Sequence, residues 1–305
     1  MPILYDTACK LHDIYQIIRF MDFETNKFIM AVFTDIDGTF IGNDTFDPGE
    51  NLALVDEFNR HNHFFAFNSS KTFHEIASMQ KDFKIKYPFI CETGGGLYHP
   101  KSIGFEYDKK RDDYFILSES IKIHRFRDLV RELIKNNFSH DFEFFDDLNQ
   151  FEKSKLTGLS GSDLALASDR DFSILIKHSG NKKSFKELNE ALNAHNLNLI
   201  QGGRFCHVCS NNNKGKATNY FLKHIMRTNE DMKIISVAIG DSTNDLDMLN
   251  TVDYPCIVKS DNNHDLLDKV KHKNVVFSSS HAPHGWIECL ERVFTIIKNQ
   301  EGAYV

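Results

Sequence analysis

The chain has 305 residues, 41% of them hydrophobic and 26% charged, which is enough apolar material for a sizeable core and about two domains. Its formal net charge is −7 and no block of Lys and Arg occurs, which argues against nucleic acid and anionic membrane surfaces as partners. No run of about 18 apolar residues occurs, so we expect no membrane span. Residues 1–20 do not read as a signal peptide, so we expect a cytoplasmic protein with reduced cysteines.

The first part of the chain alternates strand and helix patterns. Residues 28–34 are a short, nearly continuous apolar run rich in β formers, as in a parallel strand that is covered on both faces. A helix is predicted over 48–62, a strand over 63–70 and a helix over 72–83, and residues 87–96 are predicted to form a strand that ends in a glycine turn. This β-α-β-α-β order is typical of a parallel sheet with crossover helices.

From about residue 108 the pattern changes to separate strands and amphipathic helices. Strands are predicted over 113–120, 142–147 and 171–178, and helices over 123–138 and 183–196. The Cys-x-x-Cys of residues 206–209 has no second pair to complete a zinc site, and a partly buried strand is the simpler interpretation. The α/β pattern then returns, with the following elements: strand and helix over 233–249, strands over 254–260 and 274–280, helix over 284–300.

The fold class that follows is α/β, a Rossmann-like parallel-sheet core into which an α+β unit is inserted. We predict an N-terminal extension over 1–27, an α/β core over 28–107 and 209–305, and an inserted α+β unit over 108–208.

The string "FTDIDGTFIG" ends the first strand on two carboxylates, Asp35 and Asp37. Residues i and i+2 of an extended chain point to the same side, and ligands of open α/β sheets bind at the carboxyl ends of strands. An EF-hand loop would need Gly at its sixth and Glu at its twelfth position, whereas Gly38 is fourth and Phe46 is twelfth. No P-loop occurs. Asp37 as a simple turn cap is the remaining structural alternative.

A second string, "AIGDSTNDLDML", ends another apolar strand on Asp241 and opens a helix with Asn244 and Asp245. Asp241 can therefore meet Asp35 and Asp37 across neighbouring strand ends. Three carboxylates in one place are costly unless a cation neutralises them, and oxygen ligands alone favour Mg²⁺. By itself the string would fit a helix cap with a solvated turn.

Two further strings could complete a phosphate site. "FNSSKT" places Ser69, Ser70 and backbone amides at the start of a helix, where anions bind. "NNNKGKAT" places Lys214 just before another helix, where it could reach a phosphate oxygen. Each string is weak alone, since Ser-Ser is usually a cap and Lys is usually a solvated charge. Their order along the chain makes them specific.

This ordered set of motifs resembles the haloacid dehalogenase superfamily of phosphohydrolases, over roughly residues 28–107 and 209–290. The resemblance implies that residues 28–107 and 209–305 are the catalytic core and that residues 108–208 are a cap domain that sets substrate specificity. It also implies that Asp35 is a nucleophile that becomes an aspartyl-phosphate, and that Asp37 protonates the leaving oxygen and then activates water. It implies that Ser69 and Lys214 hold the phosphoryl group. Asp35, the backbone carbonyl of Asp37 and Asp241 would hold Mg²⁺, with Asp245 supporting them. An Asp nucleophile needs no activating base, which agrees with this division.

Finer strings resemble the mannosyl-3-phosphoglycerate phosphatase family within that superfamily: "FNSSKTFHEI", "YPFICETGGGLYHP", "LTGLSGSDLALASDRDFS", "GGRFCHVCSNNNKGKA" and "APHGW". The resemblance implies hydrolysis of mannosyl-3-phosphoglycerate to mannosylglycerate, a compatible solute. Arg170 and Arg204 are candidate clamps for the substrate carboxylate, because guanidinium pairs with it in a bidentate way. The residues expected to bind substrate are Ser70, Lys71, Glu92, Thr93, Gly94, Arg170, Ser173, Arg204, His207 and Asn244.

Simpler readings exist for two of these: a surface ion pair for Arg170 and a strand histidine for His207. The family usually continues Glu-Pro after "DRDFS", whereas this chain has "ILIKH", and the stretch before residue 28 is longer than usual. Another sugar phosphate, such as glucosyl-3-phosphoglycerate or sucrose 6-phosphate, is therefore the alternative substrate. A phosphomutase shares the Asp-x-Asp chemistry, and a non-catalytic sensing module shares the fold. We expect a small-molecule sugar phosphate as partner and a monomer or homodimer.

Overall fold

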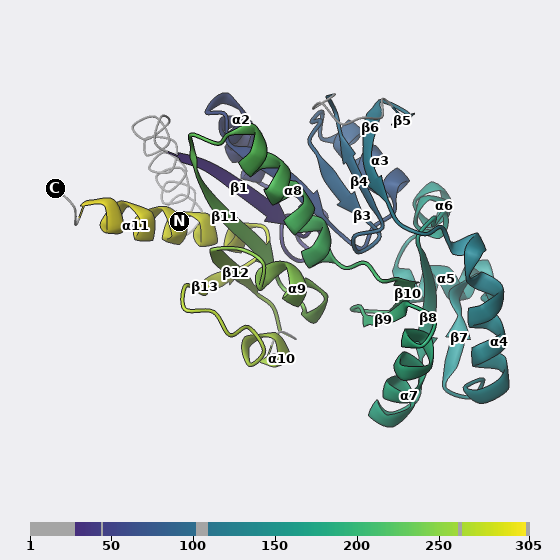
Figure 1. Ribbon diagram of the computed structural model, residues 1–305. Coiled ribbons are helices and arrows are strands. Elements are labelled where there is room, and N and C mark those ends of the chain that lie inside the picture. Colours follow the sequence, from purple (N-terminus) through teal and green to yellow (C-terminus); the bar gives the residue numbers. More distant parts are fainter. Residues whose placement is uncertain (1–27, 44, 102–108, 262–263, 303–305) are drawn as a thin grey trace, which may run out of the picture. The chain divides into compact units, whose positions relative to one another are not determined.

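The structure, a computed structural model, describes residues 28–43, 45–101, 109–261 and 264–302 (Figure 1). The chain divides into two compact units, which we call the first unit (Met1–Phe67 and Thr218–Val305) and the second unit (Asn68–Ala217). The predicted extension over 1–27 and the predicted boundary at 107/108 lie outside the described residues. The predicted division into core and cap stays a prediction.

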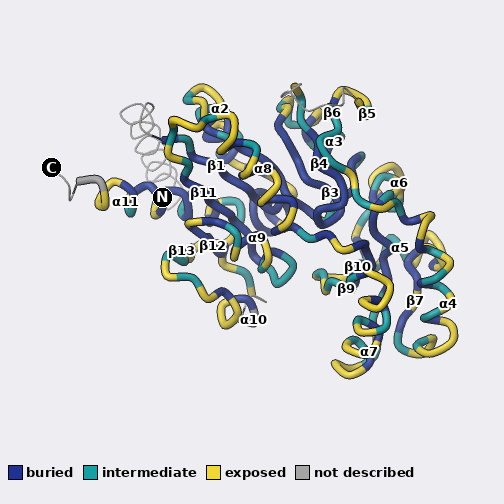
Figure 2. Tube along the Cα trace, in the orientation of Figure 1, coloured by how far each residue is buried: buried dark blue, intermediate teal, exposed yellow. Residues whose placement is uncertain are grey.

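The first unit is built on parallel strands that are neighbours in the order β13-β12-β11-β1-β2. Their bounds are β1 Phe28–Thr34, β2 Phe64–Asn68, β11 Lys233–Gly240, β12 Tyr254–Lys259 and β13 Val276–His281. Thr34 pairs with Ile239, so β1 and β11 end together. Both strands are buried along most of their length, as Figure 2 shows, which explains why β1 reads as a continuous apolar run.

Helices of the first unit connect these strands and cover them. They are α2 (Asn51–Arg60), α8 (Lys214–Thr228, whose first residues belong to the second unit), α9 (Leu246–Leu249), α10 (His264–Leu267) and α11 (His284–Gly302). The core is rich in aromatic rings. Phe40 makes edge contacts with Phe67, with centroids 5.1 Å apart, and with Trp286, with centroids 5.2 Å apart. Most of the Phe residues described in this unit are buried and fill its core.

The second unit contains two groups of strands. One is antiparallel, in the order β3-β4-β6-β5, and is formed by β3 (Phe89–Cys91), β4 (Gly96–His99), β5 (Lys110–Arg111) and β6 (Tyr114–Glu119). Helix α3 (Phe73–Asp82) begins at a capping box, in which Thr72 and Glu75 satisfy each other's backbone N–H groups. The strand predicted over 87–96, which ends in a glycine turn, is confirmed as β3 and the turn after it, and the turn leads into β4, which was not predicted.

The other group is a separate antiparallel sheet in the order β7-β8-β10-β9. Its strands are β7 (Phe142–Phe144), β8 (Ser173–His178), β9 (Leu197–Gln201) and β10 (Cys206–Ser210). Helices α4 (Arg127–Asn137) and α7 (Lys182–Asn193) share one apolar cluster with alternate residues of these strands. A second cluster joins Leu175 of β8, which points to the other face, to Leu164 of α6 (Gly161–Ser168), with Leu156 of α5 (Gln150–Thr157) packed against it.

An α/β fold with a mostly parallel sheet and a separate antiparallel insertion is thus confirmed. Strand β9 and helices α5 and α6 did not appear among the predicted elements. Over the described residues, no helix is both long and apolar enough to cross a bilayer.

Candidate active site

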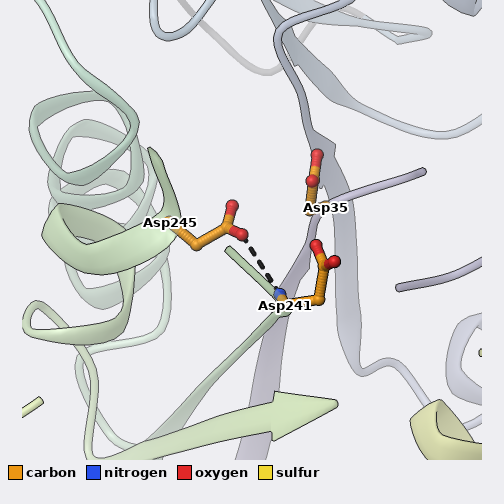
Figure 3. Close-up of side chains that lie close together, drawn as sticks. All are labelled: Asp35, Asp241 and Asp245. Atoms are coloured by element: carbon orange, nitrogen blue, oxygen red, sulfur yellow. Dashed lines mark hydrogen bonds between the residues drawn. The ribbon is translucent and has the colours of Figure 1, made fainter. Parts of the chain in front are cut away.

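Asp35 lies directly beyond the end of β1, where that strand meets the end of β11. Its backbone N–H donates to the carbonyl of Ile239 over 2.9 Å, which continues the parallel pairing by one residue. Asp241 follows Gly240, the last residue of β11, and Asp245 closes the short helical turn Thr243–Asp245. One carboxylate oxygen from each of the three aspartates lies within 4.8 Å of the others, and all three residues are buried (Figure 3).

Asp245 is held in this group by backbone donors. Its Oδ2 accepts from the N–H of Asp241 over 3.2 Å, the bond drawn in Figure 3, and from the N–H of Ser242 over 3.1 Å. A Cβ at Gly240 would lie 2.5 Å from the Asp245 Cγ, so only glycine allows this close approach. Asn244 accepts a hydrogen bond from Ser242 Oγ over 2.8 Å and stands in the same turn.

The turn after Asp35 brings a second support to Asp241. Gly38 has φ +70°, a left-handed conformation, and a Cβ there would lie 2.8 Å from Asp241 Oδ2. Thr39 Oγ1 donates to Asp241 Oδ1 over 3.3 Å. Asp37 is partly buried in this turn and forms an isolated bridge with Ile41, but its carboxylate is not among the three that cluster. Its predicted contribution of a backbone carbonyl to the metal stays a prediction.

Three buried carboxylates that share one spot need a compensating positive charge. Their exposed fractions are 6% for Asp35, 8% for Asp241 and 0% for Asp245, so solvent screens their repulsion poorly. A purely oxygen donor set fits a hard divalent cation. The residues present therefore fit a metal site.

In the second unit, residues 69–71 form a loop that is tied to residues 92–94, and we call it the serine loop. The N–H of Thr93 donates to the carbonyl of Ser69 over 3.0 Å, and the N–H of Glu92 to the carbonyl of Lys71 over 2.8 Å. The Lys71 N–H donates to Ser69 Oγ over 3.3 Å. Lys214 is buried, and its carbonyl accepts from Asn68 Nδ2 over 3.0 Å.

Residues 92–94 have three successive left-handed conformations, with φ of +46°, +57° and +91° for Glu92, Thr93 and Gly94. Such conformations are unusual for residues other than glycine and need strong local support. At Gly94 a Cβ would lie 2.4 Å from the carbonyl oxygen of Asn213, so a larger residue does not fit. Asn212 Nδ2 adds a hydrogen bond of 3.1 Å to the Thr93 carbonyl.

Arg170, Ser173 and Glu92 form one buried network. Arg170 donates through Nε to Ser173 Oγ over 3.0 Å and through Nη2 to the carbonyl of Ser70 over 2.6 Å. Its Nε lies 3.6 Å from the Glu92 Oε2, so Arg170 is an internal ion pair and not a surface one. Ser173 Oγ in turn donates to Glu92 Oε2 over 2.8 Å.

His207 is buried in β10. Burial, together with the nearby positive charges of Arg170 and Lys214, lowers the pKa of His207 to about 3, so its ring is neutral at ordinary pH. Its Nδ1 has no hydrogen-bond partner among the described residues. Arg204 lies on the exposed turn before β10 and donates through Nη1 to the carbonyl of Thr157.

Residues 32–282 match the family model of the haloacid dehalogenase-like hydrolases. The chain belongs to this family. A glucosyl-3-phosphoglycerate/mannosyl-3-phosphoglycerate phosphatase of Methanococcoides burtonii is 30% identical over 262 residues, which are 84% of this chain and 93% of that protein. A mannosyl-3-phosphoglycerate phosphatase of Pyrococcus furiosus is 29% identical over 235 residues, 75% of this chain and 91% of that protein.

Solved structures agree on the fold of this haloacid dehalogenase-like hydrolase. The sucrose-phosphatase of Synechocystis, determined with sucrose and phosphate, superposes with a TM-score of 0.59 at 15% identity, over 88% of this chain and 98% of that one. A haloacid dehalogenase-like hydrolase of Bacteroides thetaiotaomicron has the same TM-score at 14% identity, over 88% and 100%. The family resemblance and the fold class predicted from the sequence are confirmed, and the protein is a phosphatase of the phosphoric monoester hydrolase class.

Within this hydrolase the predicted residues fall into groups. The first unit brings Asp35, Asp241 and Asp245 together, with Asp37 and Asn244 in adjacent turns. In the second unit, hydrogen bonds connect the following predicted residues: Ser69, Ser70, Lys71, Glu92, Thr93, Arg170 and Ser173. His207 lies close enough to Arg170 and Lys214 for their charges to lower its pKa. Gly94 continues the turn of Thr93. The contact of Arg204 is with Thr157, away from that network.

Two supporting residues were not predicted. Trp286 Nε1 donates to Thr34 Oγ1 over 3.0 Å, and Thr34 Oγ1 donates to the backbone carbonyl of Asp35 over 2.8 Å. These two bonds connect α11 to the backbone of Asp35, one of the three acids of the cluster. The string "APHGW" contains Trp286, and a buried indole N–H needs an acceptor, but the sequence does not tell which.

Proposed function

We propose that this protein is a Mg²⁺-dependent phosphatase that hydrolyses mannosyl-3-phosphoglycerate to mannosylglycerate and phosphate. The observation that carries the proposal is the buried cluster of Asp35, Asp241 and Asp245 at the ends of β1 and β11, in a chain that is 30% identical to a glucosyl- and mannosyl-3-phosphoglycerate phosphatase. Phosphoryl transfer depends mainly on positioning and charge neutralisation, and a metal ion held by these acids would provide both.

The family resemblance assigns the steps to this chain's own residues. Asp35 attacks the phosphorus and forms an aspartyl-phosphate, while Asp37 protonates the leaving oxygen of the ester and then takes a proton from the attacking water. Ser69 and Lys214 bind the phosphoryl oxygens. Asp35, Asp241 and the carbonyl of Asp37 would hold Mg²⁺, which would supply neutralising positive charge there. Asp245 orients Asp241 by accepting its backbone N–H.

The substrate carries a carboxylate and a sugar besides its phosphate. Arg170 and Arg204 are the candidate partners of the carboxylate. Several buried polar groups of the second unit could hydrogen-bond the sugar or glycerate hydroxyls, among them His207, whose neutral ring keeps one nitrogen without a partner in the described part of the chain. The remaining candidates for substrate contacts are Ser70, Lys71, Thr93, Gly94, Ser173 and Asn244.

In the cell we place the enzyme in the cytoplasm, as a monomer or homodimer without nucleic-acid or membrane partners, in the synthesis of mannosylglycerate as a compatible solute. Glucosyl-3-phosphoglycerate is the second candidate substrate, because the M. burtonii relative bears both substrates in its name.

The test is phosphate release by the purified protein with Mg²⁺ on mannosyl-3-phosphoglycerate, glucosyl-3-phosphoglycerate, sucrose 6-phosphate and trehalose 6-phosphate. Preference for mannosyl-3-phosphoglycerate, abolished by Asp35→Asn, supports the proposal. Preference for another ester keeps the chemistry and rejects this substrate. Release from none of them, with Mg²⁺ bound, would favour the sensing module.

A further inference from the structure

We propose that Glu92 is a positioning residue, which fixes the serine loop through Arg170 and does not itself bind the sugar. This inference rests on the proposed phosphatase function, because it concerns the loop that carries Ser69. It changes the role expected from the sequence, in which Glu92 was a substrate contact.

The carboxylate of Glu92 accepts hydrogen bonds from residues 171–173 of the same unit. Its Oε1 accepts from the N–H of Asp171 over 2.9 Å. Its Oε2 accepts from the N–H of Phe172 over 3.0 Å, from the N–H of Ser173 over 2.9 Å and from Ser173 Oγ over 2.8 Å. These four donors match the roughly four acceptor sites of a carboxylate, and the residue is only 1% exposed, so little of it is left for a sugar hydroxyl.

Arg170 connects Glu92 to the serine loop. The ion pair with Glu92 and the bond to Ser173 fix the guanidinium, and the same side chain donates to the Ser70 carbonyl over 2.6 Å. The side chain of Arg170 is 8% exposed, so solvent screens these contacts poorly. A parallel link runs from Thr72 Oγ1 to the Leu166 carbonyl over 2.9 Å, which ties the start of α3 to α6.

The backbone of Glu92 reaches the same loop by a second route. Glu92 and Thr93 adopt left-handed conformations, which persist only where the surroundings over-determine them. Their N–H groups donate to the carbonyls of Lys71 and Ser69. The side chain of Glu92, through Arg170, and its backbone therefore both hold the serine loop, and such support keeps a binding site in its productive geometry.

The two roles of Glu92 predict different kinetics. A lost sugar contact would raise KM for the glycosyl ester and leave a simple aryl phosphate unaffected. A displaced serine loop would lower kcat on both substrates, since Ser69 meets the phosphoryl group of either.

The experiment compares Glu92→Gln with Glu119→Gln, a matched control whose carboxylate accepts only from Tyr98 OH among the described contacts. The amide introduced by Glu92→Gln would turn an NH₂ toward backbone donors, and losing one or two such buried charge-assisted bonds corresponds to about a 10- to 100-fold effect. We expect kcat of Glu92→Gln to fall by about that factor on mannosyl-3-phosphoglycerate and p-nitrophenyl phosphate alike, with KM for the sugar ester near that of wild type. Wild-type kcat on p-nitrophenyl phosphate, with a raised KM for the sugar ester only, would overturn the proposal.

Hydrogen exchange gives a readout that needs no turnover. Peptides that contain residues 69–71 and 171–173 should exchange faster in Glu92→Gln than in wild type or Glu119→Gln, and unchanged exchange would overturn the proposal even if no substrate is found. If Glu92→Gln does not fold, Arg170→Lys takes its place, because an ammonium cannot reach Ser70 and Ser173 together. It should show the same kcat loss on the aryl phosphate. A wild type that hydrolyses aryl phosphate but not the sugar ester would reject the proposed substrate and leave this test intact.

Discussion

Gly240→Ala should disrupt the acid cluster without touching any of its charges. The new Cβ would lie 2.5 Å from Asp245 Cγ and 2.6 Å from Asp245 Oδ2, well inside contact distance. Because Gly240 is the last residue of β11, the strand cannot move freely, so the Asp245 side chain must shift. It would then lose its hydrogen bonds from the N–H groups of Asp241 and Ser242.

The magnitude follows from those two bonds. Each joins a backbone N–H to a buried carboxylate and contributes about 1.5 kcal/mol or more, so the variant should lose about 3 kcal/mol of unfolding free energy. Asp241 would no longer be oriented by Asp245, and losing the support behind a metal ligand typically weakens metal affinity about 10- to 100-fold.

Calorimetric titration with Mg²⁺ and chemical denaturation measure both quantities. Gly203→Ala is the matched control, because a Cβ at Gly203 meets no atom within 4 Å and should leave stability and Mg²⁺ affinity unchanged. Wild-type Mg²⁺ affinity in Gly240→Ala would refute the reasoning that Asp245 orients the ligands.

Two other substitutions test single contacts. Trp286→Phe keeps an aromatic ring in the core but removes the donor to Thr34 Oγ1. It should lower the free energy of unfolding by about 1 kcal/mol, measured by chemical denaturation, and should lower kcat more than it changes KM. An unchanged kcat would contradict the link to Asp35. Burial and the charges of Arg170 and Lys214 lower the pKa of His207 in the folded state. Below about pH 6.5 the unfolded state therefore binds a proton that the folded state does not, so the free energy of unfolding should fall as the pH drops from about 6.5 toward 3. At pH 5 this contribution is about 2 kcal/mol, and His207→Gln should lose less stability than wild type between pH 7 and 5.

The acid cluster could be predicted from the sequence because its parts are local. Asp35 and Asp241 each end an apolar strand, and parallel neighbouring strands place such residues side by side. The role of Glu92 could not be predicted in this way. Its partners, residues 170–173, are about 80 positions away, and an acidic residue before a glycine turn reads equally well as a substrate contact.

The elements that the sequence did not predict have weak patterns. Strand β9, "LNLIQ", has only partial alternation and follows a helix with little separation. Helices α5 and α6 are short, and their apolar residues are too few to set a clear period. Their positions follow from packing of Leu164 and Leu156 with the far face of β8, which is a tertiary effect.

Asp241→Asn tests whether the charges of the acid cluster oppose folding when no metal is bound. Asp245 and Glu92 are satisfied by backbone N–H groups of the chain, so their charges stabilise the fold. Asp35 and Asp241 add two more charges within 4.8 Å of Asp245, and at an effective dielectric constant of about 20 each such pair repels by about 3 kcal/mol.

Asp241→Asn removes two of these repelling pairs, one with Asp35 and one with Asp245, and Asn can still accept from Thr39 Oγ1. The variant should therefore be more stable than wild type without metal, by at most about 6 kcal/mol. Addition of Mg²⁺ should raise the melting temperature of wild type strongly and that of the variant weakly, because a ligand stabilises in proportion to its affinity for the folded state. Thermal denaturation with EDTA and with Mg²⁺ measures both effects. A variant that is less stable than wild type in EDTA would mean that the charge of Asp241 stabilises the metal-free fold, as that of Asp245 does. It would contradict the interpretation that the cluster needs a cation to offset its charge.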